Sequence, residues 1–140
     1  MSHDNCFYCT DEYKDYMKEV AILEHSRVYL NNEQEYPGRC YVVLDIHKTE
    51  LFQLDEAKLA GYMKDVAKVA QAIHHVFEPD KINYAVYGDI DSHIHFHLVP
   101  KTRSGKMWGW PFELTGEEGK KKFLTEEQYK AMIEKIRMQL

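Results

Sequence analysis

The chain has 140 residues, of which 44% are hydrophobic and 29% are charged, and it carries a formal net charge of -5. This length suits a single domain, 1–140, because each half of a divided chain would be short of core. The acidic balance argues against a protein that coats nucleic acid, since phosphate backbones favour a basic face.

The compartment is predicted from three further properties of the sequence. No stretch approaches the roughly 20 apolar residues that a membrane helix needs. The first residues are polar and acidic, unlike a signal peptide. The three cysteines make a poor disulfide framework, because their number is odd and two lie close together. We therefore expect a cytoplasmic protein that binds neither nucleic acid nor membrane.

The first part of the chain predicts a short helix and three strands. The helix is expected at 12–18, and the strands at 20–23, 28–31 and 40–44. Glu24-His25-Ser26 separates the first two strands and favours a hairpin turn. The third strand is a continuous apolar run, which is typical of a buried strand, and it includes Cys40 as a core residue.

Two helices are predicted farther along. Asp55 is a candidate N-cap, apolar side chains then recur at helical spacing as far as Phe77, and Pro79 closes the helix. A last helix begins at Thr125, which can form a capping box with Gln128. Each of these helices has one apolar face.

Two more strands, 82–87 and 92–99, lie between the helices, and Pro100 is expected to end the second one. Residues 101–122 have the composition of a loop. The order β-β-β-α-β-β-α predicts an α+β fold. We expect a mainly antiparallel sheet with a long helix packed on one face and a C-terminal helix.

Three histidines alternate along the last predicted strand. Because successive side chains of a strand point to opposite faces, His93, His95 and His97 should share one open face, with apolar residues on the other. A neutral imidazole can attack phosphorus, donate a proton or bind a metal. From the residues alone, a metal site on these three histidines is an alternative.

The run of residues 93–99, His-φ-His-φ-His-φ-φ, resembles the motif of the histidine triad superfamily of nucleotide hydrolases and transferases. The resemblance extends upstream to residues 36–54 and to Asn83-Tyr84 with Gly88-Asp89, as in a bacterial branch. It covers about residues 6–100, leaving 101–140 as a variable C-terminal part. Arg39 stands where many relatives carry His, and Ser92 where Pro is frequent.

The resemblance implies a role for several residues. His95 would attack the α-phosphate and form a nucleotidyl-histidine, with backbone carbonyls setting its tautomer, and His97 would contact the phosphate or the leaving group. Asn31 matches an Asn that contacts the ribose in relatives, although it could be a simple turn residue. Asp89 is predicted to be a substrate-binding residue at a position where the branch usually has Asn. Its negative charge near the substrate is unfavourable unless a cation or a proton meets it.

A Cys-x-x-Cys pair near the N-terminus, in the arm 1–19, is a weak signal alone, because it could be redox-active or bind a metal. A structural zinc site needs four ligands. The resemblance implies that Cys6, Cys9, His47 and His93 hold structural zinc, as in some members of the superfamily, with His3 as a possible substitute.

The implied substrates are small-molecule nucleotides, of the dinucleoside polyphosphate or adenosine phosphoramidate class, and the implied assembly is a homodimer that could use the C-terminal helix. Two alternatives stay open: a nucleotidyltransferase or phosphorylase with the same intermediate, and a nucleotide-binding module with little turnover. Trp108 and Trp110 could stack on a base or pin the loop. Lys101, Arg103 and Lys106 could form a positive patch or a solvated charge run.

Overall fold

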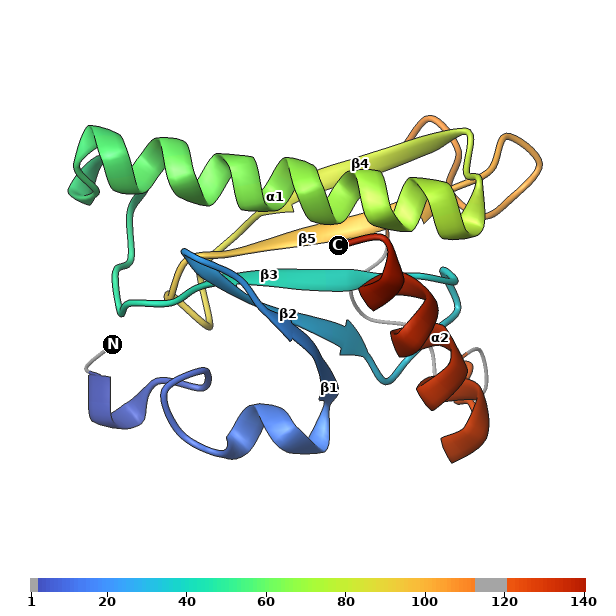
Figure 1. Cartoon of the computed structure of the whole chain (residues 1–140), viewed down its shortest axis with the longest axis horizontal. Coiled ribbons are helices and arrows are strands. Elements are labelled where there is room, and N and C mark those ends of the chain that lie inside the picture. The colour runs from blue at the N-terminus through green and yellow to red at the C-terminus, as the bar shows by residue number, and fades with distance from the viewer. Residues whose placement is uncertain (1–2, 113–120) are drawn as a thin grey trace.

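The structure is a computed structural model that describes residues 3–112 and 121–140 (Figure 1). Within these ranges a single antiparallel sheet has the strand order β1-β2-β3-β5-β4. The strands of this described part are β1 (Met17–Ile22), β2 (Ser26–Asn31), β3 (Cys40–Leu44), β4 (Lys81–Val86) and β5 (His95–Lys101). The predicted α+β class is thereby confirmed.

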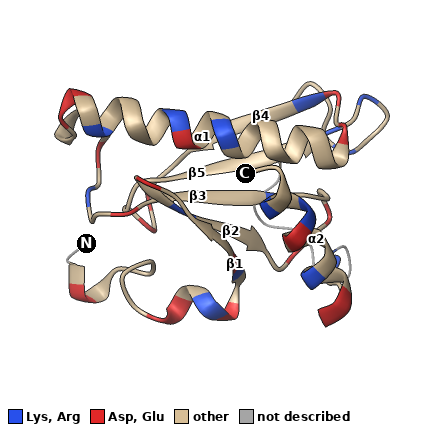
Figure 2. Ribbon diagram, viewed as in Figure 1, with Lys and Arg blue, Asp and Glu red and all other residues tan. Residues whose placement is uncertain are grey.

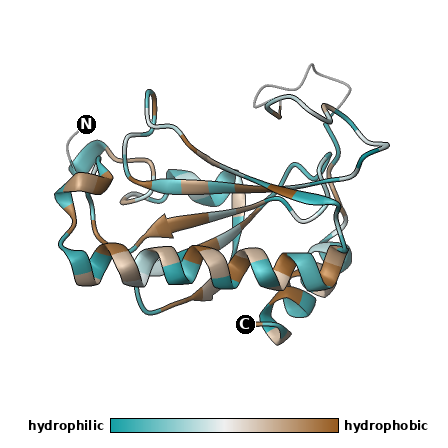
Figure 3. Cartoon of the chain, turned by 90° about the horizontal axis from the view of Figure 1, so that it is seen from above, coloured by the Kyte–Doolittle hydropathy of each residue, from teal (hydrophilic) through white to brown (hydrophobic). Residues whose placement is uncertain are grey.

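Helix α1 (Glu56–Phe77) covers one face of the sheet, and α2 (Glu126–Met138) packs beside it against α1 and β1 (Figure 1). Along α1, hydrophobic bands alternate with hydrophilic ones, as its apolar spacing predicts (Figure 3). Asp55 caps α1 by accepting a hydrogen bond from Lys58 N, and the Thr125–Gln128 capping box opens α2. In the described ranges, neither helix is long and apolar enough to span a membrane.

Most of the sheet is covered on both faces, although the edge strand β4 exposes Tyr84 and Val86. Its first face packs against the helices, where the Tyr62 hydroxyl donates a hydrogen bond to the Val42 carbonyl at 2.6 Å. Its second face is covered by the N-terminal arm, which carries the short helices η1 (His3–Asn5) and η2 (Glu12–Asp15) and lies across the sheet from α1 (Figure 1). Charges of both signs mark the two long helices, while the strands are mostly uncharged (Figure 2).

Several strand boundaries differ from the expected ones. The strand β1 begins at Met17, because the predicted helix at 12–18 is only the 3-10 turn η2. The strand β5 begins at His95, since Ile94 N donates to the Lys48 carbonyl instead of joining the ladder. The expectation that Pro100 ends this strand is wrong. Pairing with β3 stops at Leu98, so the missing N–H of Pro100 breaks no bond, and pairing with β4 continues beyond it.

Candidate active site and metal site

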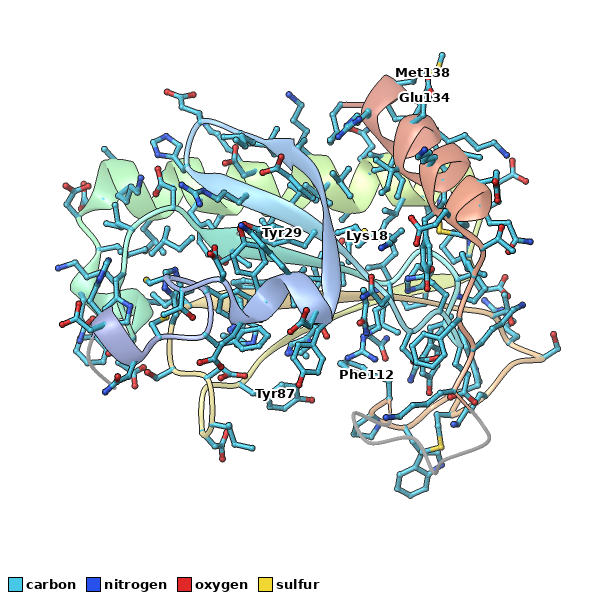
Figure 4. All side chains as sticks on the ribbon, turned by 90° about the horizontal axis from the view of Figure 1, so that it is seen from below. Lys18, Tyr29, Tyr87, Phe112, Glu134 and Met138 are labelled. Carbon is cyan, nitrogen blue, oxygen red and sulfur yellow. The ribbon has the colours of Figure 1, made fainter. Side chains whose placement is uncertain are left out.

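The three histidines lie on the sheet face opposite α1, but this face is not open as expected. His93 precedes β5 directly, and His93, His95 and His97 are only 4%, 4% and 7% exposed. The Tyr8 ring covers the first two, with ring centroids 5.7 and 4.9 Å away, and Phe112 packs on the third at 5.8 Å. Sequence periodicity could assign the shared face but not the distant segments that fold over it (Figure 4).

A backbone carbonyl fixes the tautomer of His95. Its Nδ1–H donates to the carbonyl oxygen of His93 at 2.7 Å, which leaves Nε2 with its lone pair. Burial lowers the pKa of this imidazole below its usual range, partly opposed by that hydrogen bond and by the charge of Asp91. The imidazole is therefore neutral near neutral pH, as a nucleophile must be.

The neighbouring imidazole of His97 lies 5.0 Å from the His95 ring and 4.9 Å from the Tyr41 ring. Burial lowers the pKa of His97 to about 3, and the charges of His95 and Arg39 act in the same direction. Its buried Nδ1 has no hydrogen-bond partner in residues 3–112 and 121–140. This ring is thus a neutral group that still has a hydrogen-bond donor available.

A cavity of about 470 Å³ opens beside these two imidazoles. Asn31 lines it and is 8% exposed, so the structure brings Asn31 together with His95 and His97. Asp89 is exposed and lines another cavity, of about 530 Å³, so it is not brought to the two histidines. Asp91 lines the histidine cavity instead.

Sequence reasoning did not identify Asp91 and Arg39 as residues of this cavity. The acidic turn before the triad could have indicated a carboxylate near the histidines. It contains both Asp89 and Asp91, and which of them reaches the cavity depends on how the turn folds. For Arg39 the signal was its departure from the His that many relatives carry.

The four predicted metal ligands come together at one end of the histidine row. The donor atoms of Cys6, Cys9, His47 and His93 all lie within 4.8 Å of one another. The two imidazole Nδ1 atoms are 3.3 Å apart, and His93 Nδ1 lies 3.4 and 3.5 Å from the two sulfurs. Metal–ligand bonds of about 2.0–2.3 Å in a tetrahedron give donor separations of roughly 3.3–3.8 Å, so the geometry fits zinc.

The hydrogen bonding of His93 also fits a metal ligand. Its Nε2–H donates to the Leu44 carbonyl at 2.7 Å, which turns the lone pair of Nδ1 toward the cluster. Two Nδ1 atoms that face each other this closely need a proton or a cation between them. His3 contacts the His47 ring at 5.4 Å but does not belong to the group of four. Cys40 is fully buried in the core, as predicted.

The basic residues at the end of β5 and in the following loop make structural contacts. The ammonium of Lys101 donates to the carbonyls of Met107 and Trp110, which ties the loop to the end of the strand. Lys106 pairs with Glu35 at 2.9 Å. Arg103 lies over the Trp108 ring and is not among the residues that line the histidine cavity. These contacts hold the loop through its backbone, while the Trp108 and Trp110 side chains are 38% and 71% exposed.

Comparison with known proteins identifies the family of this chain. The family model of the HIT domain matches residues 15–104, which include the whole sheet. The chain belongs to the HIT family. Two bacterial HIT proteins are similar in sequence. A HIT-like protein of Mycoplasma genitalium is 24% identical over 120 residues, or 82% of each chain. The protein hit of Bacillus subtilis is 26% identical over 112 residues, 76% of this chain and 77% of that one.

Solved HIT structures share the fold. A histidine triad protein of Bradyrhizobium japonicum has a TM-score of 0.82 at 20% identity, covering 93% of this chain and 95% of that chain. A Zn-bound histidine triad family protein of Mycobacterium smegmatis has a TM-score of 0.67 at 18% identity, covering 99% and 94%. HIT proteins are generally nucleotide hydrolases or transferases, so the buried histidine row belongs to a nucleotide-binding fold.

Proposed function

We propose that this HIT protein is a nucleotide hydrolase that cleaves at the α-phosphate through a nucleotidyl-histidine on His95. The observation that carries the proposal is the hydrogen bond from His95 Nδ1–H to the His93 carbonyl, at 2.7 Å. It selects the tautomer whose Nε2 can attack, and the carbonyl dipole stabilises the positive charge that attack puts on the ring.

The reaction has two steps. In the first, His95 Nε2 bonds to the α-phosphorus, and the bond from phosphorus to the leaving group breaks as that group takes up a proton from the medium. In the second, water attacks the same phosphorus and returns a proton to the medium, and the P–N bond breaks. This step releases a nucleoside monophosphate and restores the neutral imidazole. His97, neutral and adjacent, would donate a hydrogen bond to the phosphate or to the leaving atom.

The cavity and the chemistry both support the proposed substrate class. A nucleoside phosphate ester, anhydride or phosphoramidate offers an α-phosphorus with a leaving group, and the cavity of about 470 Å³ beside His95 offers room for it. Asn31 lines this cavity and is a candidate contact of the ribose. Asp89 lines another cavity, so we assign it no substrate contact.

Zinc, when bound, would serve a structural role. Cys6, Cys9, His47 and His93 would hold it with four protein donors, which leaves no open coordination position. These ligands join the N-terminal arm to the end of β3 and the start of β5. Since the carbonyl of His93 orients His95, fixing the His93 ring would also fix the tautomer of the nucleophile.

A turnover screen tests the proposal. Purified protein is given dinucleoside polyphosphates, nucleoside phosphoramidates and nucleotide sugars, and the released nucleoside monophosphate is measured. We expect turnover of at least one class, and a loss of roughly 10³-fold or more in His95→Ala. His74→Ala is the matched control, because His74 is exposed on α1. Full activity of His95→Ala would refute the role of His95, and tight nucleotide binding without turnover would point to a binding module.

A further inference from the structure

The Arg39 side chain is a buried cation in the wall of the histidine cavity, and it is only 6% exposed. The backbone around it is firmly held. Asn31 N donates to the Arg39 carbonyl at 3.1 Å, and Arg39 N donates to the Tyr36 carbonyl at 3.1 Å. The preceding Gly38 has φ 91°, and a Cβ there would lie 2.6 Å from the Phe77 ring, so glycine is required. The fold therefore fixes where this guanidinium lies.

The hydrogen bonding of the guanidinium is incomplete. One Nη donates to the Tyr41 hydroxyl at 3.2 Å, while the other lies 3.9 Å from Glu33 Oε2. The buried Nε has no partner in residues 3–112 and 121–140. The Glu33 carboxylate is engaged elsewhere, since its Oε1 accepts from the backbone N–H groups of Glu35 and Lys122 at 2.6 and 3.0 Å. A buried charge with so few partners is costly unless a ligand completes its hydrogen bonding.

The position of Arg39 along the row indicates which part of a ligand it can meet. Tyr41 and Phe112 both pack on the His97 ring and both lie under the Arg39 guanidinium, at 5.6 and 5.5 Å. Arg39 therefore lies near His97, the histidine that follows His95 in the row. With an α-phosphate against His95, a substrate group that extends past His97 would reach Arg39.

Resting on the proposed function, we infer that Arg39 is a specificity-determining residue that binds the second phosphate of the substrate, the one beyond the attacked α-phosphate. A guanidinium presents paired N–H donors that match the oxygens of a phosphate. Such a contact favours nucleotides with a phosphoanhydride over monoesters and phosphoramidates, which carry no second phosphate.

Binding of two unreactive probes tests this inference without depending on turnover. The probes are AMP and its diphosphate analogue with a methylene bridge between the phosphates, titrated into the wild type, Arg39→Gln and Arg39→Lys. We expect the wild type to bind the diphosphate analogue at least roughly tenfold tighter than AMP. Arg39→Gln should weaken the diphosphate by roughly 10- to 100-fold and AMP by less than about threefold. Arg103→Gln, which removes a cation outside the cavity, should leave the ratio of the affinities for the two probes unchanged.

The outcomes separate this inference from the proposed function. Equal weakening of both probes in Arg39→Gln, or a wild type without preference for the diphosphate, overturns the role of Arg39. Arg39→Lys keeps the charge and loses the paired donors, so its ratio of affinities should lie between those of the wild type and Arg39→Gln. This variant also keeps the test valid where Arg39→Gln is poorly folded. A ratio in Arg39→Lys equal to that of the wild type overturns the inference. An Arg39-dependent ratio without any turnover would instead overturn the hydrolase proposal alone.

Discussion

Replacement of His97 by glutamine should make the protein more resistant to acid. The imidazole is 7% exposed, and burial lowers its pKa to about 3, against an ordinary value of 6.5. Between these two values the unfolded chain binds a proton at this position and the folded chain does not. Lowering the pH below 6.5 therefore favours unfolding. Glutamine does not titrate, so the variant lacks this part of the pH dependence.

The size of the effect follows from the difference in bound protons. At pH 5 the pH is one and a half units below the ordinary pKa and still well above the folded value, so the wild type loses about 2 kcal/mol relative to neutral pH. The folded imidazole stays neutral at pH 5, so the whole of this loss comes from protonation of the unfolded chain.

The assay is urea unfolding at about pH 7 and about pH 5, with the same zinc concentration throughout. The loss of unfolding free energy between the two pH values should be smaller in His97→Gln than in the wild type by about 2 kcal/mol. His75→Gln, which removes an exposed imidazole of α1, is the control and should follow the wild type. An equal loss in His97→Gln and the wild type would show that the folded imidazole takes up a proton, contrary to its burial.

Three further predictions concern the metal site, the core and the assembly. The wild type should purify with bound zinc, whereas the Cys6→Ser, Cys9→Ser double variant should purify without it and should melt at a lower temperature; a wild type without zinc in metal analysis would contradict the site. Tyr62→Phe, which removes the donor to the Val42 carbonyl, should lower the unfolding free energy by about 1 kcal/mol in urea titrations. Tyr84 is 52% exposed on the outer strand β4, so Tyr84→Lys should convert a homodimer to a monomer in light scattering, whereas a monomeric wild type would contradict the dimer.

The interface of such a homodimer is expected on β4 and not on α2. The sequence left the apolar face of the C-terminal helix as a candidate surface. In the structure Tyr129, Ile133 and Ile136 of that face are buried within their own chain, against β1 and α1. The strand β4 lies at the edge of the sheet and exposes Tyr84 and Val86.

Local patterns predicted most of the fold because they depend on near neighbours. The cap at Asp55, the capping box at Thr125 and the buried run at Cys40 each encode a local preference that the packing preserves. The end of β5 was missed because it depends on the partner strand. A proline usually ends a strand, but at Pro100 the pairing with β3 has already stopped two residues earlier.

The sequence predicted the histidines and cysteines that the structure brings together, but not the side chains that surround them. Alternation put His95 and His97 on one face, and the family pattern gathered the four metal ligands, which the structure brings within 4.8 Å. The coverage of that face by Tyr8 and Phe112 depends on contacts between segments far apart in the chain. The sequence likewise could not predict which charges line the cavity, because Asp91 lines it while Asp89 does not.

Trapping the covalent intermediate tests the role of His95 most directly. The protein is mixed with a turned-over nucleotide, quenched with alkali, in which a P–N bond survives better than in acid, and digested for mass spectrometry. We expect a nucleotidyl group on the peptide that contains His95, and no such group in His95→Ala or in protein mixed with nucleoside alone. Turnover without any adduct in the wild type, or an adduct retained in His95→Ala, would contradict nucleophilic attack by His95.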